Sequence, residues 1–135
     1  MPFVHRLRVR FHECDPQGVV FNAHYFSYFD IALTEMWRAA FGSYANVVQN
    51  GTDVVVVEAG ATFRAPARFD DEVDVELAIE RLGTTSMTMA AAVRRDGQLL
   101  VEGRMVHVFV DTATMAKRPI PDWLRTGLEA YASPS

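Results

Sequence analysis

The sequence contains one cysteine, Cys14, so no disulfide can form within the chain. Such a protein suits a reducing compartment, and we expect it in the cytoplasm. No apolar stretch approaches the roughly 18 residues that span a membrane. The first eleven residues alternate apolar and charged side chains, which is not the pattern of a signal peptide. A net charge of −4 gives no sign of the basic surface that nucleic-acid binding requires.

The sequence also shows no internal repeats, linkers or low-complexity segments. What is present is typical of a globular protein: 135 residues, of which 50% are hydrophobic. This length supports one core but not two independent ones. We therefore expect a single domain over residues 1–135.

Most of the chain has the period-two alternation of apolar and polar residues that is typical of half-buried strands. The dipeptide Asp96-Gly97 between two such segments is a strong hairpin signal. A short helix is expected at 122–132. The predicted strands cover residues 3–13, 53–65, 72–82, 85–95 and 99–111.

Residues 22–41 have a different period, with apolar side chains every three or four positions, which predicts a helix. Asn22 is a candidate N-cap and Gly42 a candidate C-cap. The other faces of this helix are also rather apolar, so it should be wrapped by other structure. The sequence therefore predicts an α+β fold, with a curled antiparallel five-stranded sheet around one long central helix.

The run from Asp15 to Tyr25 (DPQGVVFNAHY) resembles the 4-hydroxybenzoyl-CoA thioesterase family, whose members have the wrapped architecture known as the hotdog fold. Residues 63–73 (FRAPARFDDEV) and 106–121 (VHVFVDTATMAKRPIP) extend the resemblance over nearly the whole chain. The resemblance implies an acyl-CoA thioesterase, with Asp15 as the catalytic carboxylate. Many members have a histidine where this sequence has Asn22, and here His24 follows two residues later.

A carboxylate ahead of a helix N-terminus suits thioester hydrolysis. Asp15 can attack the carbonyl as a nucleophile or deprotonate a water as a general base. The backbone N–H groups at the start of the helix can stabilise the oxyanion that develops. Gly18 allows the substrate to approach the loop closely, and the Asn22 amide can contact the carbonyl or a water. His24 is a further catalytic candidate.

Coenzyme A has phosphates, which need basic partners. Lys117 and Arg118, after the last strand, are the best cluster for this, and Arg64 belongs to a weaker second set. A solvated charged loop is the alternative interpretation of the first cluster. Tyr25, at the end of the motif, is the remaining candidate for substrate binding.

Other chemistries receive less support. Cys14 could be a nucleophile, but a lone cysteine at a strand end is more often an inert apolar residue. The spacing of His12, Cys14, Asp15 and His24 matches no common zinc pattern, so we expect no metal and no redox cofactor. His107 lies among apolar neighbours and is expected to be a hydrogen-bonded core histidine.

Three other functions remain open. A non-catalytic acyl-CoA-binding protein could retain the same pocket. A hotdog dehydratase or hydratase would need a short His-Gly motif that the sequence lacks. A thioesterase that acts on acyl carrier protein would use surface basic residues such as Arg94 and Arg95 for docking.

We also expect a homo-oligomer, either a dimer or a tetramer of two dimers. The first and last strands of an open sheet have unpaired edges that favour pairing with a second copy. By resemblance, residues 54–63 of the partner should help to line the pocket. The helix is apolar on more faces than one short sheet can cover, so part of the following set should contact the partner: Tyr25, Tyr28, Phe29 and Trp37.

Overall fold

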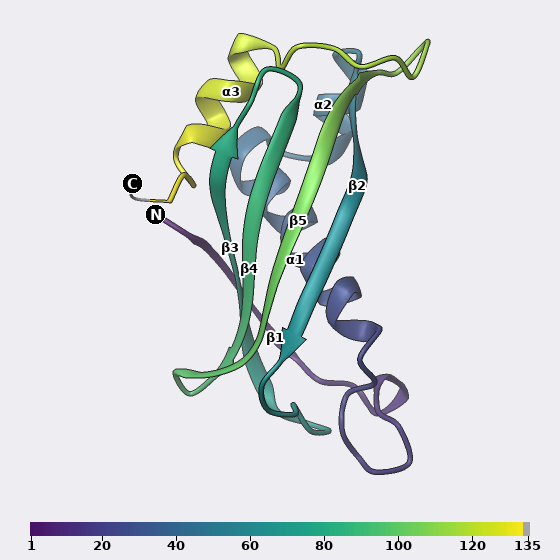
Figure 1. Cartoon of the computed structure of the whole chain (residues 1–135), viewed down its shortest axis with the longest axis vertical. Helices are drawn as coiled ribbons and strands as arrows, with labels where there is room; N and C mark the ends of the chain where they lie inside the picture. The colour runs from purple at the N-terminus through teal and green to yellow at the C-terminus, as the bar shows by residue number, and fades with distance from the viewer. Residues whose placement is uncertain (134–135) are drawn as a thin grey trace.

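The computed structural model describes residues 1–133. A long helix lies behind a five-stranded antiparallel sheet, with two short helices near one end of the strands (Figure 1). The elements follow in the order β1 (Phe3–Arg8), a 3₁₀ turn (Phe11–Glu13), α1 (His24–Phe41), α2 (Tyr44–Gln49), β2 (Thr52–Phe63), β3 (Glu72–Leu82), β4 (Ser86–Arg95), β5 (Gln98–Asp111) and α3 (Asp122–Glu129).

The strands lie in the order β1-β3-β4-β5-β2. The edge strands are therefore β1 and β2, and the expectation that the last strand lies at an edge is wrong. β5 pairs with β4 through a tight hairpin and with β2 along its other side, from Thr52 opposite Asp111 to Phe63 opposite Val101. β2, which precedes β3 in the chain, thus lies at the edge opposite β1 and pairs with the last strand.

The period-two pattern predicted the central strands well. β3 has the predicted bounds, and its buried residues alternate with half-buried acidic ones. The hairpin prediction is also confirmed, because Asp96 has φ 50° and Gly97 has φ 82°. Two positive φ values are what a two-residue hairpin with the right twist requires.

The first strand ends earlier than predicted, at Arg8 instead of residue 13. A buried carboxylate causes the change. Oε1 of Glu13 accepts hydrogen bonds from the Arg10 N–H at 2.7 Å and from the Tyr28 hydroxyl at 2.9 Å. The chain therefore turns away from the sheet and towards α1, although the alternation of residue types continues.

The helix α1 begins two residues later than predicted. Its N-cap is Ala23, and no side chain caps this end, so the prediction of Asn22 as the cap is wrong. Gly42 is the C-cap as predicted, with φ 85° and its N–H donating to the Arg38 carbonyl oxygen at 2.9 Å. The C-terminal helix ends at Glu129, three residues before the predicted end.

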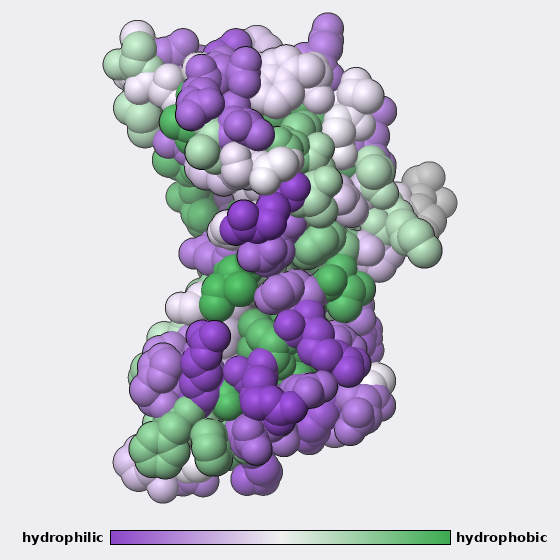
Figure 2. All heavy atoms as spheres, turned by 180° about the vertical axis from the view of Figure 1, so that it is seen from behind, coloured by the Kyte–Doolittle hydropathy of each residue, from purple (hydrophilic) through white to green (hydrophobic). Residues whose placement is uncertain are grey.

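The four large aromatic residues predicted to reach a partner are buried within their own chain: Tyr25 is 3% exposed, Tyr28 and Phe29 0%, and Trp37 2%. The curved sheet covers them because they all belong to the helix face that packs on it. The opposite face of α1 carries exposed Asp30, Ile31, Thr34 and Arg38. From behind the sheet, hydrophilic and apolar residues are mixed over the surface (Figure 2).

One long helix packed against the concave face of a curved antiparallel sheet is the hotdog fold. The predicted fold is therefore confirmed. No helix within residues 1–133 is long and apolar enough to cross a membrane.

Candidate functional site

The loop before α1 holds the Asp15 carboxylate in a defined position. The Gln17 N–H donates to Oδ1 of Asp15 at 2.8 Å, and the Gly18 N–H donates to the Asp15 carbonyl oxygen at 2.9 Å. The Asp15 N–H in turn donates to the Val19 carbonyl oxygen at 2.9 Å. Gly18 has φ 78°, a conformation that side chains disfavour, so glycine allows the loop to close here.

Backbone hydrogen bonds hold this loop against two other segments of the chain. The Val20 N–H donates to the Ala67 carbonyl oxygen at 2.9 Å, and the Phe21 N–H donates to the Glu13 carbonyl oxygen at 3.0 Å. The Glu13 side chain is bound to Tyr28 on α1, as described above. Sequence reasoning missed Glu13, since nothing in its spacing distinguishes a buried acid from the exposed residues around it.

At the N-terminus of α1, fewer backbone N–H groups lack an acceptor than at a regular helix end, where the first four do. The N–H groups of His24, Tyr25 and Phe26 donate to carbonyl oxygens three residues earlier, at 2.9, 3.3 and 3.2 Å. In the described chain, the N–H groups of Asn22 and Ala23 donate to no protein group. These two amides are therefore the ones available to a developing oxyanion.

A cavity of about 260 Å³ lies beside this helix end. The Tyr25 hydroxyl accepts a hydrogen bond from the Ala67 N–H at 3.0 Å, and burial raises its pKa. The cavity thus joins three predicted residues, Asn22, Tyr25 and Arg64, whereas Asp15, Gly18 and His24 are not in its wall. Its full lining is Val20, Asn22, Tyr25, Phe63, Arg64, Ala65 and Pro66.

Two of the predicted residues have structural partners. The Arg64 guanidinium forms an ion pair with Glu102 on β5. The His24 ring packs against Phe21 in an edge-to-face manner, with ring centroids 6.3 Å apart. An exposed ion pair contributes little stability, so Arg64 can exchange its partner for a phosphate.

Lys117 and Arg118 do not join the Asp15 loop within one chain. The Arg118 N–H donates to the Phe109 carbonyl oxygen at 2.9 Å, and its guanidinium donates to the Gly51 carbonyl oxygen at 3.0 Å. Both contacts place this segment near the start of β2. The chain after β5 and the loop before α1 lie at opposite ends of the molecule (Figure 1).

The alternative chemistries of the loop gain nothing from the geometry. Burial raises the pKa of the Cys14 thiol, with Glu13 and Asp15 adding to the shift, so the nucleophilic thiolate is disfavoured. Residues 1–133 contain no group of three or more His, Cys, Asp or Glu side chains placed to hold a metal ion.

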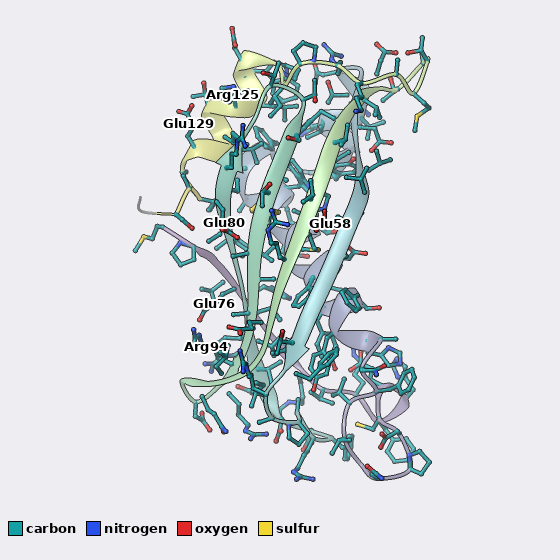
Figure 3. All side chains as sticks on the ribbon, in the orientation of Figure 1. Glu58, Glu76, Glu80, Arg94, Arg125 and Glu129 are labelled. Carbon is teal, nitrogen blue, oxygen red and sulfur yellow. The ribbon has the colours of Figure 1, made fainter. Side chains whose placement is uncertain are left out.

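A larger hollow, about 630 Å³, lies elsewhere, on the outer face of the sheet. It is lined mainly by small residues such as Ala78 and Ala90, and no predicted site residue belongs to it. Arg94 lies on this face and pairs with Glu76 at 3.2 Å (Figure 3). The volume of a hollow therefore does not by itself identify the catalytic site.

Comparison with known proteins agrees with this fold. The model of the Thioesterase-like superfamily matches residues 9–128. The acyl-CoA thioester hydrolase YbgC of Escherichia coli O6:H1 is 30% identical over 116 residues, which are 85% of this chain and 87% of that protein.

Two solved structures are similar over almost their whole length. A hypothetical protein from Thermus thermophilus is 33% identical, with a TM-score of 0.87 over 95% of this chain and 98% of the other. The dynemicin thioesterase, whose structures concern polyene binding, is 26% identical, with a TM-score of 0.91 over 100% of both chains.

The fold and these similarities define a hotdog protein of the thioesterase type. With a family match across most of its length, the chain belongs to the Thioesterase-like superfamily. It is a thioester hydrolase.

Proposed function

We propose that the protein hydrolyses acyl-CoA, with Asp15 as nucleophile or general base and the N–H groups of Asn22 and Ala23 as oxyanion donors. The observation that supports this most directly is the loop itself. It fixes a carboxylate through the Gln17 N–H, immediately ahead of a helix end with two free amides.

The reaction adds the elements of water across the thioester. In the general-base route, Asp15 takes a proton from a water whose oxygen attacks the carbonyl carbon. In the nucleophilic route, the Asp15 carboxylate attacks first, and water then cleaves the resulting anhydride. In both routes the C–S bond breaks, coenzyme A leaves as its thiolate and is protonated, and the acyl group becomes a carboxylic acid.

The other predicted residues take supporting roles. Gly18 leaves the loop open to the substrate, and Asn22 and Tyr25 line the cavity at the helix end. Arg64 is available for a phosphate of coenzyme A. His24, in the first turn of α1, stays a candidate for an assisting role, with its ring packed against Phe21.

We further propose that two copies pair through β2. This edge strand has 12 residues, against 6 in β1, and its centre is exposed, with Val56 at 49% and Val57 at 59%. The shorter β1 offers half as many residues for such pairing. The assembly is then a dimer, alone or as half of a tetramer.

Such pairing would complete the site. Antiparallel pairing about the centre of β2, between Val57 and Glu58, places the Thr52 end of one copy beside the Phe63 end of the other. The partner's residues near Lys117 and Arg118 then approach the loop of Asp15. A strand of this length spans roughly 40 Å, so one chain alone cannot bring these groups together.

A charge at the centre of β2 is expected to weaken the dimer. In Val57→Glu each introduced acid would lie opposite Glu58 of the partner subunit near the two-fold axis, and the repulsion should raise the dimer dissociation constant about tenfold or more. Val4→Lys, which introduces a charge on the other edge strand, β1, is the control, since Val4 is 49% exposed against 59% for Val57. Sedimentation velocity at micromolar concentration measures both, and a wild-type protein that is an active monomer would refute the proposal.

Removing the basic pair is expected to weaken binding of coenzyme A. Lys117→Ala with Arg118→Ala should raise KM for acyl-CoA about tenfold and change kcat much less, because the phosphates are remote from the reacting carbon. Arg6→Ala with Arg8→Ala removes the same charge at the far edge of the sheet and serves as the control. An unchanged KM at low salt would exclude this assignment.

The function itself is tested by turnover of a panel of acyl-CoA thioesters, compared with the same acyl groups on acyl carrier protein. We expect the coenzyme A esters to be the better substrates. The basic residues considered for carrier-protein docking are already paired, Arg94 with Glu76 and Arg95 with Asp71 at 2.7 Å. Binding without turnover of any ester would indicate a non-catalytic protein. We place the protein in the cytoplasm, where acyl-CoA is available.

A further inference from the structure

Glu13 is the only acidic residue within residues 1–133 that is buried, with 7% of its surface exposed. It is the last residue of the 3₁₀ turn Phe11–Glu13 and lies two residues before Asp15. Its Oε1 atom accepts hydrogen bonds from the Arg10 N–H and the Tyr28 hydroxyl, as described above. One intervening residue therefore links the proposed catalytic carboxylate to a carboxylate that is fixed in the interior.

The other buried polar side chains of this part of the chain are not fixed in this way. Oγ1 of Thr52 and both ring nitrogens of His107, which lines a cavity between α1 and β2, are bonded to no protein group within residues 1–133. The expectation of a hydrogen-bonded core histidine is therefore correct about burial and wrong about the hydrogen bond. Thr52 and His107 belong to β2 and β5, whereas Glu13 belongs to the segment that carries Asp15.

Tyr28 provides the contact of Glu13 with α1. It is fully buried, and burial together with the Glu13 carboxylate raises the pKa of its hydroxyl, which therefore stays protonated and donates. Its ring packs edge to face on Tyr25, with ring centroids 5.8 Å apart. Tyr25 in turn lines the cavity at the helix end and accepts the Ala67 N–H. The Glu13 side chain is thus attached to the part of α1 that forms the cavity wall.

The backbone of Glu13 makes a second connection, next to the oxyanion donors. Its carbonyl oxygen accepts from the Phe21 N–H at 3.0 Å, and Phe21 directly precedes Asn22 and Ala23, whose N–H groups are free in the described chain. Glu13 is therefore held to α1 through its backbone and through its side chain. Loss of the side-chain contact would let this segment, and Asp15 with it, shift relative to the two donors.

Stability of the loop alone does not account for an acid at this position. Removing a carboxylate from water is unfavourable, and a well-packed apolar side chain often stabilises a protein at least as well as a buried charged group. A carboxylate differs because it accepts directional hydrogen bonds from two donors, here Arg10 in the turn and Tyr28 in the helix. Attack on a carbonyl demands such fixed geometry, since a displacement of about 1 Å can lower the rate about 100-fold.

We propose that Glu13 is a positioning residue, whose contact with Tyr28 holds the Asp15 carboxylate at its working distance from the N–H groups of Asn22 and Ala23. The inference rests on the proposed catalytic role of Asp15. Because Glu13 is buried and bound to Tyr28, it acts on the reaction through Asp15 and not by touching the substrate.

Three variants test this role by turnover of the best acyl-CoA. Glu13→Ala should lower kcat about 30-fold and change KM less than about twofold, because it displaces a reacting group and leaves the phosphate contacts intact. Tyr28→Phe, which removes only the hydroxyl, should lower kcat about tenfold. Glu13→Gln keeps an amide oxygen that can accept from both donors, so its kcat should stay within about threefold of wild type. A loss in Glu13→Gln as large as in Glu13→Ala would overturn the inference.

Tyr44→Phe controls for the loss of a buried tyrosine–carboxylate hydrogen bond. The Tyr44 hydroxyl also donates to a carboxylate, that of Asp53, but near the opposite end of the molecule from the Asp15 loop (Figure 1). Urea unfolding should show both tyrosine variants to be less stable than wild type, whereas kcat of Tyr44→Phe should stay within about twofold of wild type. An equal loss of kcat in both would mean that any loosening of the fold slows the reaction, and would overturn the inference.

Combination with Asp15→Asn separates a positioning role from an independent one. If Glu13 acts through Asp15, Glu13→Ala should lower the residual activity of Asp15→Asn by less than about twofold. An equal fold reduction with and without Asp15 would overturn the inference, as would a wild-type kcat in Glu13→Ala. If Glu13→Ala does not fold, Tyr28→Phe takes its place in the same comparison. Full activity of Asp15→Asn would instead be a failure of the proposed function, so the two failures are distinguishable.

Discussion

Replacing Asp15 by asparagine is expected to lower kcat/KM for acyl-CoA hydrolysis about 100-fold or more. An amide can neither accept the proton of an attacking water nor form an anhydride with the acyl group. The fold should be unaffected, because the amide oxygen of the new side chain can still accept the Gln17 N–H that now binds Oδ1 of Asp15. Thiol release measures the rate, and circular dichroism checks the fold.

Asp96→Asn is the matched control for this variant. It also replaces one carboxylate in a tight turn, between β4 and β5, where a φ of 50° suits asparagine as well as aspartate. Its turnover should equal that of wild type. If Asp15→Asn keeps near-full activity on the best substrate, Asp15 is neither the nucleophile nor the general base. Only the proposed role of the helix amides as oxyanion donors would then remain.

The fold was predictable because most strands bury one face. Val73, Val75, Leu77 and Ile79 alternate with polar residues, and a slip of one residue would expose them all, so sequence alone defines β3. The helix α2 was missed because it has only six residues, fewer than two turns. Its signal was Ser43, whose hydroxyl accepts the Asn46 N–H at 3.1 Å.

The site was less predictable, since it depends on contacts between distant segments. Asp15 and Gly18 belong to a local motif that the sequence displays directly. The roles of Glu13 and His107 depend on which neighbours surround them after folding, and their residue types carry no sign of it. The position of Lys117 far from Asp15 likewise follows from the strand order, which periodicity does not determine.

The stability of the protein is expected to depend on the titration of His107. The folded protein holds the pKa of this imidazole at about 4, because burial disfavours the charged form, whereas the ordinary value is 6.5. Between these values the unfolded chain binds a proton that the folded chain does not. The free energy of unfolding should therefore fall as the pH is lowered through this range, by about 3 kcal/mol in total.

His107→Phe isolates this contribution. The variant keeps the two acidic residues, Asp30 and Asp53, that line the cavity between α1 and β2 together with His107, so their titration affects both proteins alike. At pH 7 it should be at least as stable as wild type, because an unpaired buried polar group has been removed. Urea unfolding from pH 7 to pH 4 should then show the variant gaining about 1.4 kcal/mol on wild type per pH unit below 6.5. Parallel curves for the two proteins would mean that the ring is protonated in the folded state as readily as in water, and that solvent reaches the cavity between α1 and β2.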